Sequence, residues 1–193
     1  ITLGNHSLRR PEIADYLDEN EFIIRPYNYH SSAPGRGTAI IERGAFRAAV
    51  INLQGTAFLE PIENPFIAAD REIERLNEEG IKIIDFHAEA TGEKKALGFY
   101  LDGRVSAVFG THTHVQTSDE QILPQGTGYI TDLGMTGPYF SVLGVEPEKV
   151  IYKLKTNLPV RFSNPDGECT LEGIFFETDD KTGKTVHIER FRK

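Results

Sequence analysis

The sequence predicts an α/β (α+β) fold in which two β-sheets form a sandwich flanked by helices. Helix-like and strand-like patterns alternate along the whole chain. Several predicted strands follow one another without an intervening helix, which a purely parallel sheet does not allow. No repeat, low-complexity tract or linker divides the 193 residues, a length that suits one domain. We therefore expect residues 1–193 to form a single domain.

The first half of the sequence shows two helical and three strand-like stretches. Pro11 and the apolar stripe behind it predict a short helix up to about Asn20. Asn64 as N-cap, followed by Pro65, predicts a longer helix that ends at Gly80. Strands are predicted at residues 22–24, 38–42 and 46–53, the last two as an antiparallel pair.

The second half of the sequence is richer in strands. Apolar runs predict strands at residues 82–86, 105–109 and 128–131. Pro147 begins a predicted short helix, and a further strand is expected at residues 158–162. Alternating residues predict a terminal hairpin between residues 170–177 and 185–191.

Composition and charge argue against two classes of protein. No apolar run approaches the ~20 residues of a membrane-spanning helix, so we expect no membrane partner. With 21 Lys and Arg against 29 Asp and Glu, the net charge of −8 disfavours binding to duplex nucleic acid. The lone Cys169 cannot form an intramolecular disulfide, and no secretory signal is visible. We expect a cytoplasmic protein.

Three segments run from an apolar, strand-like stretch directly into potential metal ligands: residues 1–6, 83–87 and 107–114. In α/β folds the ends of strands bring residues from distant parts of the sequence together. Four of the six histidines fall in these segments. Imidazole nitrogen and amide oxygen are suitable ligands for transition metals. The pattern therefore indicates a metalloenzyme.

Each segment taken alone has a simpler interpretation. His112 and His114 are two apart, so on an extended chain they face the same side, but an isolated pair equally fits a solvated strand end. His87 alone fits a hydrogen-bonded core or surface residue; Asp85 or Glu89 could orient it. His30 and His187 are expected at the surface, and no substrate-binding residue is identified.

The motifs Gly4-Asn5-His6, His87 and Gly110-Thr111-His112-Thr113-His114 resemble the later motifs of calcineurin-like metallophosphoesterases. The wider sequence resembles the YmdB-type branch, which acts on 2′,3′-cyclic nucleotides. The resemblance extends over essentially the whole chain and includes these longer stretches: Asn52–Gly55, Asp85–Thr91, His112–Thr117, Ile130–Tyr139 and Lys155–Phe162.

This resemblance implies a four-layer αββα sandwich with a dinuclear centre. Asn5, His87 and His112 resemble ligands of one metal, His114 resembles a ligand of the other, and His6 resembles the catalytic histidine. The cofactors would be two metal ions (iron, manganese, zinc or magnesium). A metal-bridging hydroxide would then attack the phosphorus of a 2′,3′-cyclic nucleotide or another small phosphodiester, with His6 as general acid.

The sequence departs from the family pattern at two places. The strands that end in Asp-x-x-Gly and Gly-Glu-Asn, with the remaining ligands, have no counterpart after Ile1. We therefore expect further sequence before Ile1, and residues 1–193 would be the C-terminal part of the family domain. Such a chain alone could form homo-oligomers. The alternative is a degenerate, non-catalytic metal-binding regulator.

The second departure lies next to His6, where Ser7-Leu8 replaces the Thr-Trp usual in this branch. Asp132 is assigned no chemistry.

Overall fold

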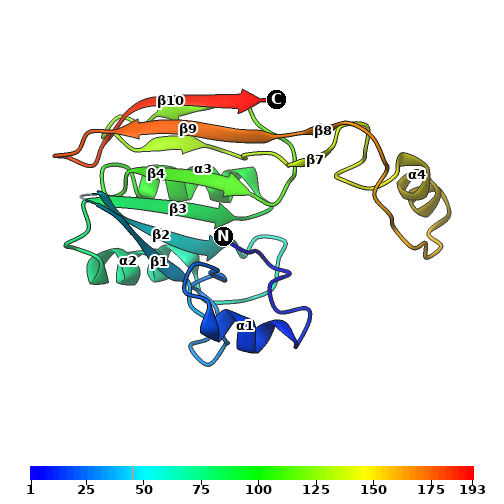
Figure 1. Ribbon diagram of the computed structural model, residues 1–193, viewed down its shortest axis with the longest axis horizontal. Helices are drawn as coiled ribbons and strands as arrows, with labels where there is room; N and C mark the ends of the chain where they lie inside the picture. Colours follow the sequence, from blue (N-terminus) through cyan, green and yellow to red (C-terminus); the bar gives the residue numbers. More distant parts are fainter. Residues whose placement is uncertain (45) are drawn as a thin grey trace.

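A six-stranded mixed sheet forms the centre of the protein (Figure 1). The computed structural model describes residues 1–44 and 46–193. The strand order is β1–β2–β3–β4–β6–β5. Its four central strands are parallel: β2 (Phe46–Gln54), β3 (Ile81–His87), β4 (Ala107–Thr111) and β6 (Gly128–Ile130). The edge strands β1 (Thr38–Arg43) and β5 (Gln121–Ile122) are antiparallel to their neighbours. The predicted mixed α/β class is confirmed.

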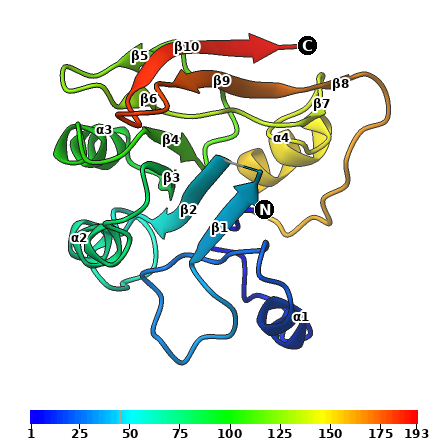
Figure 2. The same ribbon diagram turned by 60° about the vertical axis from the view of Figure 1, so that its left-hand side comes forward.

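Two helices cover one face of this sheet. Figure 2 shows α2 (Pro65–Arg75) and α3 (Thr91–Tyr100) side by side on that face, with α4 (Pro147–Thr156) and the N-terminus on the other side. The main hydrophobic core lies between the two helices and the sheet; its largest fully buried side chains include Ile51, Leu53, Ile84, Phe86 and Leu97. Alternate residues of β2 and β3 point into this core, as the period of a strand requires.

A hairpin of β9 (Glu172–Thr178) and β10 (Thr185–Arg192) forms a second sheet. It confirms the predicted terminal hairpin. β10 packs against β5 and β6, and the Thr185 hydroxyl donates to the Ser106 carbonyl oxygen at 2.7 Å. A third, very short sheet pairs β7 (Gly137–Pro138) with β8 (Cys169–Thr170). α4 lies beyond this pair, at the right-hand side of Figure 1.

The first residues of the chain lie across the open face of the central sheet. The Leu3 amide donates to the Ile24 carbonyl oxygen at 2.9 Å, and the Asn52 side-chain amide of β2 donates to the Leu3 carbonyl oxygen. Residues 1–3 and 22–24 were expected as strands, but only Thr2 and Ile24 form isolated bridges. These contacts direct Asn5 toward the carboxyl end of β3.

Other boundaries also differ from the sequence-based expectations. α1 (Ile13–Glu19) begins after Pro11, and α2 ends at Arg75 rather than at Gly80. The predicted strand at residues 158–162 is wrong, because these residues belong to no helix or strand. Leu158 is 52% exposed and Phe162 44% exposed. An apolar stretch becomes a strand only where a partner strand accepts its hydrogen bonds.

α3 was not expected from the sequence. It has no side-chain N-cap and contains two glycines, which weakens its local signal. Its inner face carries Lys94 and Gly98 beside Leu97, so the apolar period of a helix is interrupted. A lysine on the buried face is stable only because of a partner elsewhere in the fold, which is described below.

The N-terminus of α2 offers a local test of this architecture. The Asn64 side-chain oxygen accepts from the Phe66 amide at 2.9 Å and caps the helix. We expect Asn64→Ala to lower the free energy of unfolding by about 0.5–2 kcal/mol, because one amide at the helix start loses its partner. Urea denaturation measures this loss. A matched Asn77→Ala change, outside the helix, should cost less.

A candidate metal centre at the strand ends

The carboxyl ends of the parallel strands bring two of the predicted histidines into contact. In the sheet register His87 lies opposite Gln54 of β2 on one side and Thr111 of β4 on the other. His112 follows Thr111 directly. The His87 and His112 rings have centroids 4.9 Å apart and stand nearly perpendicular, at 87°. The convergence predicted for separate strand ends is present for this pair.

Three potential ligand atoms meet at this point. His87 Nε2 lies 3.1 Å from Asn5 Oδ1 and 3.1 Å from His112 Nδ1. Asn5 arrives from the N-terminal segment, His87 ends β3, and His112 begins the loop after β4. The three side chains therefore converge from three separate parts of the chain, and their role as ligands of one metal stays a prediction.

The outer hydrogen bonds determine which ring nitrogens carry protons. The Thr111 hydroxyl donates to Asp85 Oδ1 at 2.8 Å, so its oxygen accepts from His87 Nδ1 at 2.9 Å. His112 Nε2 lies 3.0 Å from a Glu89 carboxylate oxygen, which can only accept. In the neutral rings, His87 Nε2 and His112 Nδ1 are then unprotonated, and their lone pairs face each other. Glu89 orients His112, not His87, and Asp85 acts on His87 through Thr111.

Burial keeps His87 neutral. Removal from solvent and the nearby His112 lower the pKa of His87 to about 4. A neutral imidazole is the form that binds a metal, and its outer N–H is held by an oxygen, as metal-bound histidines require. The two nitrogen lone pairs and the amide oxygen of Asn5 would repel one another if no cation lay between them. This donor set fits a transition-metal ion.

Glycines allow this close approach. A Cβ atom at Gly4 would overlap the His87 ring, and one at Gly110 would overlap the Thr131 carbonyl oxygen. Both glycines belong to motifs identified in the sequence, Gly4–His6 and Gly110–His114. His112 itself has a φ of 103°, a left-handed backbone that is unfavourable for a residue with a side chain. The surrounding structure must therefore hold the loop in place.

A buried ion pair holds the histidine loop. Asp132 Oδ2 accepts from Lys94 Nζ at 2.6 Å and from the Thr113 amide, between the two histidines, at 3.2 Å. Both charged side chains are only 1% exposed. Asp132 Oδ1 also accepts from the Gly134 amide at 3.0 Å. Asp132 is thus the counterion that makes the burial of Lys94 on α3 possible, and it also anchors the histidine loop.

His6 follows the candidate ligand Asn5 directly in the chain, and His114 is two residues beyond His112. His6 is exposed, and its pKa is lowered by partial burial and by Arg9, while Glu60 opposes and His112 adds to this effect. His114 is also exposed, with a φ of 63°, and lines a separate hollow with Gln116 and Glu172. In the described part of the chain, no group of three His, Cys, Asp or Glu side chains is arranged to hold a metal.

The residues thus fit one metal ion and leave a second without a complete ligand set. Asn5, His87 and His112 supply an oxygen and two nitrogens, whereas His114 stays a predicted ligand of the other metal. The positioning roles of Thr111, Lys94 and Asp132 were not predicted from the sequence. Thr111 lies in the motif Gly110–His114 and Asp132 in the stretch Ile130–Tyr139, whereas Lys94 lies in none of the quoted motifs.

The comparisons with known proteins show to which family this chain belongs. The YmdB-like protein family matches residues 1–191. A 2′,3′-cyclic-nucleotide 2′-phosphodiesterase of Bacillus subtilis is 52% identical over 191 residues, which cover 98% of this chain and 72% of that protein.

Two solved structures extend the comparison. A hypothetical protein from Thermus thermophilus is 38% identical with a TM-score of 0.93, over all of this chain and 75% of that one. A Mycoplasma pneumoniae protein described as a novel phosphatase is 36% identical with a TM-score of 0.91, over all of this chain and 71% of that one. No helix among residues 1–44 and 46–193 is long and apolar enough to cross a bilayer. The chain belongs to the YmdB-like protein family and is an enzyme of the hydrolase class.

Proposed function

We propose that this protein is a metal-dependent phosphodiesterase that hydrolyses 2′,3′-cyclic nucleotides to 3′-nucleotides. The observation that carries the proposal is the convergence of three potential ligand atoms. His87 Nε2 lies 3.1 Å from His112 Nδ1 and 3.1 Å from Asn5 Oδ1. The 52% identity to a protein named as a 2′,3′-cyclic-nucleotide 2′-phosphodiesterase supports the substrate class. A metal ion bound there would supply Lewis acidity toward the phosphoryl oxygens. Two ions are expected for the complete centre, with His114 serving the second.

The chain's own residues account for the proton that the reaction needs. Hydrolysis joins a water oxygen to phosphorus and breaks the bond to the ribose 2′ oxygen, which must take up a proton as it leaves. His6 is exposed, follows Asn5 directly in the chain and is not a member of the proposed ligand set. We assign it the role of general acid, which places a proton on the departing 2′ oxygen.

Outer residues keep the centre in position. Asp85 and Thr111 hold His87, and Glu89 holds His112, so the lone pairs stay directed inward. Asp132 and Lys94 hold the backbone between the two loop histidines. These groups orient the ligands and do not need to touch the substrate.

Metal removal tests the proposal. We expect hydrolysis of adenosine 2′,3′-cyclic phosphate by the full chain to stop after dialysis against a chelator. Re-addition of manganese, iron or zinc should restore it, because neutral imidazoles and an amide bind such ions reversibly. Product analysis by chromatography should give the 3′-nucleotide. Undiminished turnover by protein shown to be metal-free would contradict the proposed metal dependence.

A further inference from the structure

A hollow of about 400 Å³ opens directly beside Asn5. Its walls are contributed by Leu8, Tyr29, His30, Ala33 and Ile62, with Arg9 and Glu60 as charged groups. This volume lies within the range of about 300–1,000 Å³ typical of small-molecule sites. We call it the Asn5 hollow. Asn5 belongs both to its wall and to the candidate metal centre, so the two are continuous.

His6 follows Asn5, the residue that the hollow and the histidine cluster share, and precedes Leu8 and Arg9 of the hollow wall. If His6 gives its proton to the departing ribose oxygen, the rest of the nucleoside lies on the His6 side of the phosphorus. The Asn5 hollow is lined by Asn5 and Leu8, on either side of His6 in the chain, so it is the cavity that we assign to the nucleoside.

The lining has the chemistry that a nucleoside needs. The Tyr29 ring is held in place because its hydroxyl donates to Gln54 Oε1 at 2.8 Å. The His30 ring is held because Nδ1 lies 2.7 Å from the Ser32 hydroxyl and accepts from the Ser32 amide at 3.2 Å. Flat, fixed rings among the apolar Leu8 and Ile62 offer surfaces for a nucleobase. Arg9 and Glu60 can contact polar base or ribose edges.

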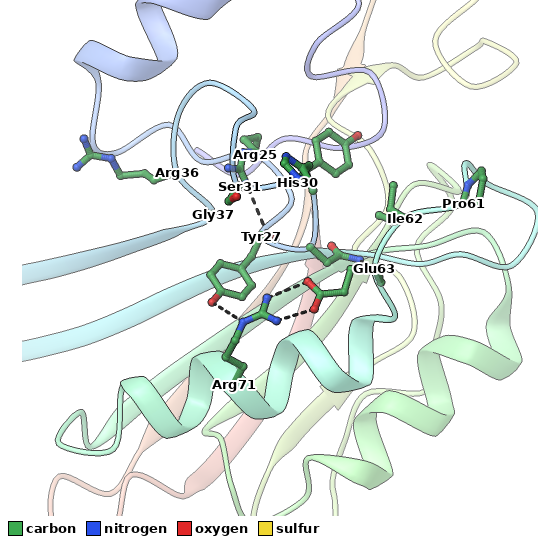
Figure 3. Close-up of a pocket in the computed structure, with 12 residues that line it drawn as sticks. Arg25, Tyr27, His30, Ser31, Arg36, Gly37, Pro61, Ile62, Glu63 and Arg71 are labelled. Carbon is green, nitrogen blue, oxygen red and sulfur yellow. Dashed lines mark hydrogen bonds and ion pairs between the residues drawn. The ribbon is translucent and has the colours of Figure 1, made fainter.

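A larger neighbouring cavity of about 880 Å³ is a weaker candidate (Figure 3). It shares Tyr29, His30 and Ile62 with the Asn5 hollow but does not reach Asn5. Two of the arginines in its wall, Arg25 and Arg71, already have close partners within the protein. Figure 3 shows Arg71 bound to Glu63 by two hydrogen bonds and to the Tyr27 hydroxyl. The buried Arg25 donates to backbone carbonyl oxygens.

We propose that the Asn5 hollow binds the nucleoside part of the substrate. This inference rests on the proposed function and adds the position of the base. It predicts that the enzyme distinguishes a nucleotide from a cyclic phosphate that has no base. The wild-type protein should show a kcat/KM about 10-fold or more higher for adenosine 2′,3′-cyclic phosphate than for 1-O-methylribose 2′,3′-cyclic phosphate, because the latter cannot stack.

Filling the hollow tests this assignment. In the metal-loaded full chain, Ala33→Trp should raise KM for the adenosine substrate about 10-fold or more. Its kcat/KM for the methylribose substrate should stay within about 2-fold of wild type. Ser31→Trp is the matched control, because Ser31 is in the same loop and lines only the larger cavity. Ser31→Trp should leave KM and kcat/KM for both substrates unchanged.

A second variant keeps the test decisive if the first one does not fold. If Ala33→Trp does not fold, Ile62→Asn should raise KM selectively for the adenosine substrate, because it replaces an apolar wall. Selective loss in either variant supports the hollow as the nucleoside site. Equal kcat/KM of the two substrates in wild type, or equal effects of a folded variant on both, overturns it. Hydrolysis of neither substrate by the metal-loaded wild type overturns the proposed function, and the nucleoside site with it.

Discussion

Lys94→Met is expected to lower the free energy of unfolding by about 3–5 kcal/mol. The substitution keeps the length of the side chain but removes its charge, so the carboxyl group of Asp132 is left buried without its counterion. Both side chains are 1% exposed, and the Nζ–Oδ2 distance is 2.6 Å. Water cannot replace the lost partner at such a site. Urea denaturation followed by circular dichroism measures the effect.

Lys95→Met is the matched control for this change. Lys95 is the next residue of α3, its side chain is 46% exposed, and it lies 3.7 Å from Asp119. An exposed pair of this kind contributes only about 0–1 kcal/mol. The double variant Lys94→Met/Asp132→Asn should recover part of the stability, since no unpaired charge remains and the Asn side-chain oxygen can still accept a hydrogen bond from a loop amide. Similar losses for Lys94→Met and Lys95→Met would show that the buried pair does not stabilise the fold as inferred.

The same pair connects stability with the candidate metal centre. Asp132 accepts from the Thr113 amide and so holds a loop in which His112 adopts a φ of 103°. Such a backbone persists only where its surroundings hold it. We therefore expect the Lys94→Met protein also to bind metal more weakly, even at temperatures at which it stays folded.

His6→Gln is expected to lower kcat for adenosine 2′,3′-cyclic phosphate by about 10²- to 10⁴-fold. Glutamine keeps a polar side chain but cannot give a proton to the departing ribose oxygen. The metal content, measured by mass spectrometry, should be unchanged, because His6 is outside the Asn5, His87 and His112 set. The contrast between lost turnover and retained metal distinguishes a general acid from a ligand.

The choice of leaving group sharpens this test. p-Nitrophenolate leaves without needing a proton, so bis(p-nitrophenyl) phosphate should lose much less rate in His6→Gln. His187→Gln serves as the control variant, since His187 lies exposed on β10, 3.6 Å from Glu189. Normal turnover of the cyclic nucleotide by His6→Gln, at unchanged metal content, would rule out the assigned role.

Much of the fold was predictable from local patterns. The apolar strands β2, β3 and β4, the capped helix α2 and the terminal hairpin were expected, because each carries its own period and its own boundary residues. The predicted strand at residues 158–162 and the missed helix α3 show where such reasoning fails. In both, the outcome depends on a partner in space: the first stretch lacks a neighbouring strand, and the second buries a lysine.

The candidate site divides in the same way. Asn5, His87 and His112 could be named in advance, since they follow strand-like segments and the ends of parallel strands meet. His114 was predicted with them, but lies in a different hollow. A left-handed turn at each of the two loop histidines removes the simple alternation that would direct both rings to one side.

The amino-acid sequence by itself determined the α/β class, the family motifs and the residues that meet at the strand ends. Only the tertiary structure decided which nitrogen of each imidazole faces inward, what holds the histidine loop, and where a hollow opens beside Asn5. The physical reason is that these features depend on pairs far apart in sequence. Lys94 and Asp132, 38 positions apart, are neighbours only after the sheet and α3 have packed.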